Sequence, residues 1–190
     1  MNVQPGRFTL ALFAILLVAL GSRSTKAQAI SAGSAGLVIS ELMYNPQGTD
    51  DFEYIEFYNA GASSLSLVGY KLVKDEKGDG LDYTFGGEVL QSGEFIVVVE
   101  DTVQFAQRYM TVDSPYYREG LRIAGQWKGG LGNSGEKLQV QDPEGDFIFK
   151  FSYEIAADWP QLASGMGSSI ELVTSAILPA NLQEREKFLE

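Results

Sequence analysis

The sequence has 190 residues, which suits a single domain, and its 25 acidic and 14 basic residues give a formal net charge of −11. The phosphates of nucleic acids and anionic membrane surfaces repel so acidic a chain. The chain contains no Cys and no His, which excludes disulfides, thiolate nucleophiles, an imidazole general base and the usual zinc sites.

Residues 1–29 have the three parts of a secretory signal peptide. Arg7 precedes an uncharged apolar run at 8–20, and Ala27 and Ala29 place small residues at the two positions that a signal peptidase inspects. This run of 13 residues is shorter than the roughly 20 residues that span a membrane as a helix. We therefore expect cleavage after Ala29 and an exported protein without a membrane span, in the periplasm, at the cell surface or outside the cell. Cleavage after Ala35 and an uncut anchor are the alternatives.

Short β-prone runs follow a flexible linker at 30–36. One short helix is predicted over 102–110, behind an N-cap at Asp101 or Thr102. Strands are predicted at 37–44, 54–59, 66–73, 82–85, 95–99, 138–141, 147–153 and 169–173. Their number and spacing are typical of an all-β sandwich or barrel. Residues 179–190 are charged and helix-prone and do not resemble another strand, so the domain is expected to span 37–178.

The stretch from Gly130 to Gly135 matches the G-x-G-x-x-G pattern of dinucleotide-binding proteins. That pattern binds a pyrophosphate only where a helix follows it, and here β-prone residues follow. We favour the alternative, a tight turn in which the glycines and Asn133 adopt positive φ.

Two acidic groups are candidates for irregular calcium binding, because Ca²⁺ accepts varied sets of oxygen ligands. They are Asp75, Asp79 and Asp82, and Asp50, Asp51 and Glu53. The first group departs from the EF-hand pattern, since Lys77 and Gly86 stand where oxygen ligands belong. An acidic, solvated turn is the simpler interpretation. No cofactor is therefore expected, with calcium the one that the sequence leaves open.

Two further pairs of residues are candidates for function. Glu41 and Glu56 lie on strands that could pair, and two carboxylates on adjacent strands could serve glycoside hydrolysis; hydrogen bonding to the backbone or to Tyr is the favoured interpretation. Tyr116 and Tyr117 lie in a long segment between predicted elements. Tyr and Trp are frequent anchors in binding surfaces, so these two residues are the candidate binding residues, although a tyrosine pair in a loop can also cap a core.

Six segments in this order resemble the bacterial lamin-tail domain. They are VISELMYNP (38–46), EYIEFYN (53–59), LVGYKL (67–72), SGEFIVVVED (92–101), GGLGNSGEKLQVQDPEG (129–145) and DWPQLASGMGSSIELV (158–173). The resemblance implies an immunoglobulin-like β-sandwich of about eight to nine short strands with one short helix and no disulfide. It also implies that Asn133, Gly135 and Glu136 open a hairpin strand, and that Trp159 and Pro160 begin the stretch before the last strands. Bacterial members commonly continue with a further Trp and a Gly/Pro-rich close, whereas this chain has residues 178–190 instead.

The residues and the resemblance together predict an exported, non-catalytic module for binding, adhesion or anchoring. Its partner would be a protein or a cell-surface polymer, and no nucleic acid is expected to bind. One alternative is an accessory domain of an exported hydrolase whose catalytic part is missing or encoded separately. A free-standing hydrolase that uses Glu41, Glu56 or the Asp groups is the third hypothesis.

Overall fold

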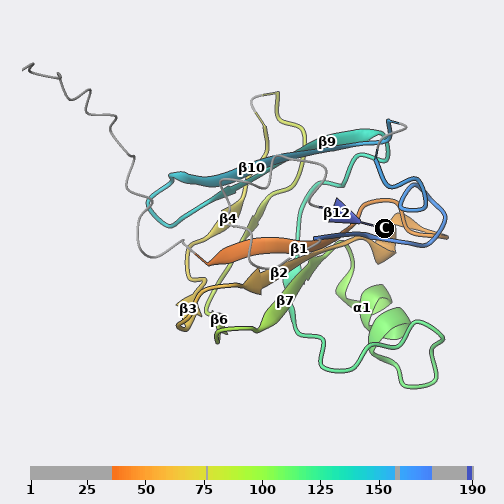
Figure 1. The fold of residues 1–190 in the computed structure, drawn as a ribbon, viewed down its shortest axis with the longest axis horizontal. Coiled ribbons are helices and arrows are strands. Elements are labelled where there is room, and N and C mark those ends of the chain that lie inside the picture. Colours follow the sequence, from red (N-terminus) through yellow and green to blue (C-terminus); the bar gives the residue numbers. More distant parts are fainter. Residues whose placement is uncertain (1–35, 76, 157–158, 173–187, 190) are drawn as a thin grey trace, which may run out of the picture.

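The computed structural model describes residues 36–75, 77–156, 159–172 and 188–189. Figure 1 shows two layers of β-strands, with β9 and β10 in one layer and β1, β2 and β7 in the other, and α1 on the far side of the second layer. The predicted signal peptide and most of the linker lie outside the described residues. Within the described part of the chain, no helix is long and apolar enough to cross a membrane.

The larger sheet has six strands in the order β12-β11-β1-β2-β7-β8. All neighbours in it are antiparallel except β7 and β8, which run parallel. Its strands are β1 (Leu37–Met43), β2 (Tyr54–Asn59), β7 (Phe95–Val99), β8 (Ile123–Gln126), β11 (Ile170–Leu172) and β12 (Phe188–Leu189). A bulge between Ile39 and Glu41 interrupts the regular pairing of β1 with β2.

The second sheet has four strands in the order β10-β9-β4-β5, and a separate pair joins β3 to β6. The strands are β3 (Leu65–Ser66), β4 (Lys71–Leu72), β5 (Tyr83–Thr84), β6 (Val89–Leu90), β9 (Gly135–Gln141) and β10 (Phe147–Glu154). Three short helical segments complete the described chain, namely η1 (Asp50–Phe52), α1 (Thr102–Phe105) and the π-helical turn η2 (Ala106–Met110).

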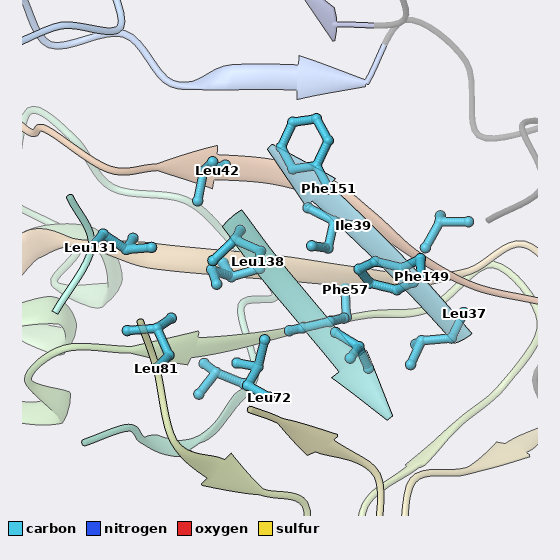
Figure 2. Close-up of a cluster of buried hydrophobic side chains, with 14 of the residues drawn as sticks. Leu37, Ile39, Leu42, Phe57, Leu72, Leu81, Leu131, Leu138, Phe149 and Phe151 are labelled. Carbon is cyan, nitrogen blue, oxygen red and sulfur yellow. The ribbon is translucent and has the colours of Figure 1, made fainter. Parts of the chain in front are cut away.

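The main hydrophobic core lies between the two sheets. Figure 2 shows Leu37, Ile39 and Leu42 from β1 and Phe57 from β2 pointing into the same space as side chains of the other sheet. Those side chains include Leu72 of β4, Leu138 of β9, and Phe149 and Phe151 of β10. Burial of these apolar surfaces holds the layers together, since the chain has no disulfide.

A second hydrophobic cluster covers the other face of the larger sheet. It consists of Met43, Tyr54, Val97, Val99, Phe105 and Tyr109. The apolar run of β7 explains why both clusters form: Ile96 and Val98 belong to the main core, while Val97 and Val99 belong to the second cluster. The prediction that 95–99 is a strand buried on both faces is therefore confirmed.

The predicted strand at 66–73 is wrong in its extent. Gly69 adopts φ +81° and turns the chain, which leaves the two separate short strands β3 and β4. Strands β6 and β8 were not predicted, because runs of two to four residues carry little periodicity. In β10 a bulge after Phe147 places that ring outside the core, with the Lys150 amine 3.8 Å from its centroid.

The predicted helix at 102–110 is partly confirmed. Asp101 is its N-cap, with a carboxylate oxygen that accepts hydrogen bonds from the amides of Val103 and Gln104. Only its first four residues are α-helical, and a π-helical turn follows. The interpretation of the tail as free of strand is wrong for Phe188–Leu189, which pair with β11; the rest of 173–190 lies outside the described residues.

Candidate functional site

Three glutamates form a row on the outer face of the larger sheet. Glu41 of β1 pairs with Glu56 of β2 on one side and with Glu171 of β11 on the other. Residues directly opposite each other on neighbouring strands point to the same face. The expected pairing of the strands of Glu41 and Glu56 is thus confirmed, and the structure adds a third carboxylate that lies 130 positions along the chain from Glu41.

Glu41 is held in a hydrogen-bonded network and is 5% exposed. One carboxylate oxygen accepts hydrogen bonds from the hydroxyls of Tyr54 and Ser169, and the other accepts one from Arg118 at 2.8 Å. These three donors offset the free-energy cost of burying the carboxylate, because the ion pair and the hydrogen bonds replace its interactions with water. The expected hydrogen bond from a Tyr to Glu41 is therefore confirmed, and its structural role stays a prediction.

Glu56 has a different partner. The hydroxyl of Ser40 donates a hydrogen bond of 2.7 Å to its carboxylate. Burial raises the pKa of Glu56, and the nearby charges of Glu41 and Glu171 raise it further, while Ser40 and Arg118 act in the opposite direction. Both carboxylates are thus engaged in hydrogen bonds with neighbouring side chains.

A cavity of about 390 Å³ opens beside this network, between the loop before β8 and the start of β11. Tyr116 and Tyr117 stand on one side of it and are 43% and 40% exposed. Its other lining residues are Met43, Tyr109, Pro115, Arg118, Gly167, Ser168, Ser169 and Glu171. The structure thus places both predicted binding residues at a cavity whose other polar groups were not predicted.

Tyr109 is a polar group of this cavity that sequence reasoning missed. It lies in η2, is 3% exposed, and its hydroxyl has no hydrogen-bond partner in the part of the chain that the structure describes. Its ring packs against Tyr54 and Phe105 at centroid distances of 5.5 and 4.8 Å. Burial raises the pKa of Tyr109, so the hydroxyl keeps its proton at neutral pH.

Arg108 holds the rim of the cavity in position. Its guanidinium lies between two rings, 4.3 Å from the centroid of Phe52 and 4.0 Å from that of Tyr116. It also donates a hydrogen bond of 2.8 Å to the carbonyl of Gln47. These cation–π contacts restrain the ring of Tyr116, whereas Tyr117 has no comparable ring contact among the described residues.

The first calcium candidate is only partly assembled. Asp75 and Asp79 line one cavity of about 450 Å³ together with Glu136. An Asp75 oxygen is occupied by the amides of Lys77 and Asp79, at 2.8 and 3.0 Å, as in a solvated turn. Asp82 is not part of that cavity; its backbone pairs with Lys128.

The second calcium candidate is divided between surface and interior. Asp51 accepts a hydrogen bond from the hydroxyl of Thr49, and Asp50 is exposed. Glu53 is 1% exposed and points inward, where one oxygen accepts the amide of Leu131 at 3.2 Å. Across the described ranges, no three acidic side chains are grouped so as to hold a metal ion. The expectation of no cofactor, with calcium left open, stays a prediction.

The glycine-rich turn is structural, as favoured. Gly135 adopts φ +101°, and a Cβ there would lie 2.5 Å from the carbonyl oxygen of Tyr153. Glu136 closes the turn by accepting the amide of Gly132 at 2.8 Å. The expectation of positive φ is wrong for Asn133, Gly130 and Gly132, because among the residues of this motif only Gly135 adopts it. Strand β9 follows the turn, so no helix faces a phosphate here.

Trp159 lies in the main core and is 8% exposed. Its ring packs against that of Phe151 at a centroid distance of 6.0 Å. Pro160 follows it and is partly buried. The pair therefore attaches the segment before β11 to the second sheet.

Comparison with known protein families identifies the family of this chain. The family model described as Lamin Tail Domain matches residues 30–154, more than half of the chain. The chain belongs to the lamin tail domain family. A search among curated proteins finds no match. The lamin tail domain is an immunoglobulin-like β-sandwich, and the two facing sheets, the one short α-helix and the lack of cysteine agree with it. Ser169 and Glu171 of the cavity lie beyond the matched residues of this lamin tail domain.

Proposed function

We propose that this lamin tail domain is an exported, non-catalytic module that binds a partner in the cavity beside Tyr116 and Tyr117, and so serves adhesion or anchoring. The observation that carries the proposal is the pair of exposed tyrosines at the mouth of a cavity of about 390 Å³. Cavities of roughly 300 to 1,000 Å³ are typical of ligand sites, and Tyr is among the residues that contribute most to binding energy.

The rigidity of the site supports a role in binding. Arg108 fixes Tyr116 by stacking, and the ion pair of Arg118 with Glu41 joins the same loop to β1. A rim that is ordered before the partner arrives loses little conformational entropy on binding. The engagement of Glu41 and Glu56 in hydrogen bonds disfavours a carboxylate hydrolase.

An array of peptides and glycans, probed with the labelled protein purified after export, tests the proposal. We expect saturable binding that the double substitution Tyr116→Ala, Tyr117→Ala weakens at least about tenfold, since hot-spot residues contribute about 2 kcal/mol or more each. Phe147→Ala removes an equally exposed ring from β10 and is the matched control. Equal loss in both variants, or turnover of glycoside or phosphoester substrates by the protein, would contradict the proposal. The mature N-terminus of the exported protein checks the location.

A further inference from the structure

The hydroxyl of Tyr109 lies in a place where a ligand could provide it with a hydrogen-bond partner. Tyr109 is 3% exposed, lines the cavity, and forms no hydrogen bond at its oxygen with any described residue. The rings of Tyr54 and Phe105 pack on it, so the hydroxyl is held within the protein. A buried polar group without a partner destabilises a protein. A ligand that enters the cavity and hydrogen-bonds to this oxygen would remove that cost.

The charge around the cavity favours a cationic ligand. Arg118 is paired with Glu41, so its charge is compensated within the network. Glu171 lines the cavity, is exposed, and takes part in neither of the ion pairs of the described residues. Glu56 adds a third carboxylate to the same row. Arg108, whose guanidinium lies 5.5 Å from the ring centroid of Tyr109, takes part in neither of these ion pairs and offsets one of these charges. Three carboxylates thus face two guanidinium groups, and Glu171 is the carboxylate exposed at the cavity, so an anionic ligand would meet repulsion there.

The rim of the cavity already shows how a guanidinium binds to these rings. Arg108 lies 4.0 Å from the ring centroid of Tyr116, outside the cavity lining. Tyr117, its neighbour, is 40% exposed and offers a second ring at the mouth. Cations bind to the faces of aromatic rings, and the apolar stem of Lys or Arg packs on them.

We propose that this cavity binds a single basic side chain, Lys or Arg, of a partner protein, and this inference rests on the proposed function of the cavity as a binding site. The stem of that side chain lies on Tyr117, the charged group faces Glu171, and one N–H donates to the hydroxyl oxygen of Tyr109. The side chains of Lys and Arg carry several hydrogen-bond donors and no acceptor. They therefore suit the hydroxyl oxygen of Tyr109 and the carboxylate of Glu171, which can both accept hydrogen bonds.

The test is an NMR titration of the exported, purified protein with Nα-acetyl-lysine amide, Nα-acetyl-arginine amide and, as the neutral isostere, Nα-acetyl-norleucine amide. We expect the two basic probes to shift the amide signals of residues 114, 116–118 and 167–171, and the neutral probe to bind several-fold more weakly. N-acetylglucosamine tests the other kind of ligand. Equal affinity for norleucine amide, or tighter binding of the sugar, would overturn the inference.

Three variants locate the contacts. Tyr109→Phe should weaken the basic probes by about twofold to tenfold while leaving the thermal unfolding midpoint equal or higher, because it removes an unpartnered buried hydroxyl. Glu171→Gln should weaken them by about twofold to fivefold. Glu144→Gln, in the exposed turn between β9 and β10, makes the same change of charge and should have no effect. Equal effects of the two Glu substitutions, or unchanged affinity in Tyr109→Phe, would overturn the assignment.

The two proposals fail in different ways. Loss of array binding in the tyrosine double variant, together with no response to the basic probes, leaves the binding module in place and removes the basic side chain as its ligand. The reverse outcome is also possible to recognise. If the tyrosine double variant binds the array as the wild type does, while the affinity for the basic probes depends on Tyr109 and Glu171, the proposed function is contradicted and the cation site is supported.

Discussion

Glu53 lies immediately before β2, with its side chain turned into the protein and 1% of its surface exposed. Burial raises its pKa to about 8; the hydrogen bond from the Leu131 amide opposes this shift, and the charges of Asp50, Glu100 and Glu136 add to it. One oxygen accepts that amide, and the other has no partner among the described residues. With a pKa of about 8, the carboxyl is largely neutral at pH 7.

This shift predicts a pH-dependent stability. The unfolded chain releases the proton of Glu53 near pH 4.5, whereas the folded protein keeps it up to about pH 8. The contribution of Glu53 to the free energy of unfolding is therefore fully present below pH 4.5 and is lost as the pH rises to 8. The slope of this loss is at most about 1.4 kcal/mol per pH unit. Glu53→Gln stays neutral and should become progressively more stable than the wild type between pH 5 and 8 in urea unfolding. Parallel curves for the two proteins would contradict the raised pKa.

Glu41 shows the opposite solution to the burial of a carboxylate. It has three donors from three distant parts of the chain, namely Tyr54, Arg118 and Ser169. Glu41 and Glu53 are both acids on or beside neighbouring strands. They differ in whether a surrounding loop places a basic side chain next to the carboxylate. Arg118 reaches Glu41, whereas neither of the two ion pairs among the described residues involves Glu53.

At the scale of elements, the hairpin of β9 and β10 depends on the turn that precedes it. Gly135 pairs with Glu154 and begins the longest pairing in the smaller sheet. Its positive φ and the approach of the Tyr153 carbonyl leave no room for a side chain. Gly130, five positions earlier in the same glycine-rich stretch, has open space around it.

Substitution of Gly135 and Gly130 by Ala tests whether the turn needs glycine at position 135 for its backbone conformation. Gly135→Ala should lower the free energy of unfolding by about 2 kcal/mol or more, because it combines a strained φ with a clash against the backbone. Gly130→Ala should change it by less than about 0.5 kcal/mol. Chemical denaturation of both variants measures the difference. A similar cost at the two positions would show that the turn does not need Gly135.

At the scale of the whole molecule, the larger sheet is completed by residues far beyond the family match. The match ends at residue 154, whereas β11 pairs with β1 through Glu41 and Leu42. Ile170 of β11 and Trp159 are both in the main core. The segment after 154 thus covers the edge of β1, supplies core side chains, and forms one wall of the cavity.

A chain that ends at residue 154 should therefore lose cooperative folding. Removal of a buried Trp and a buried Ile costs about 5 kcal/mol or more, which is comparable to the whole stability of a typical domain. A chain that ends at residue 172 keeps both and is the control. Calorimetry should show a sharp transition for the longer chain and none for the shorter one. The same transition in both would mean that β11 contributes little.

The sequence by itself determined the features that depend on local patterns. Alternation and turn residues predicted β1, β2, β7 and β10 nearly to the residue, and Asp101 marked the start of α1. The sequence also named Tyr116 and Tyr117 as candidate binding residues, and both are exposed. These features follow from neighbours within a few residues along the chain, where periodicity and capping act.

Only the tertiary structure decided which of these residues meet. Strands β3, β4 and β6 have two residues each, so pairing with distant strands forms them and periodicity cannot reveal them. The cavity joins Tyr109, Arg118 and Glu171, which come from η2, a loop and the late strand β11. The burial that distinguishes Glu53 from its exposed neighbour Asp50 has the same origin. Such contacts arise from packing across the sandwich, which no local pattern in the sequence records.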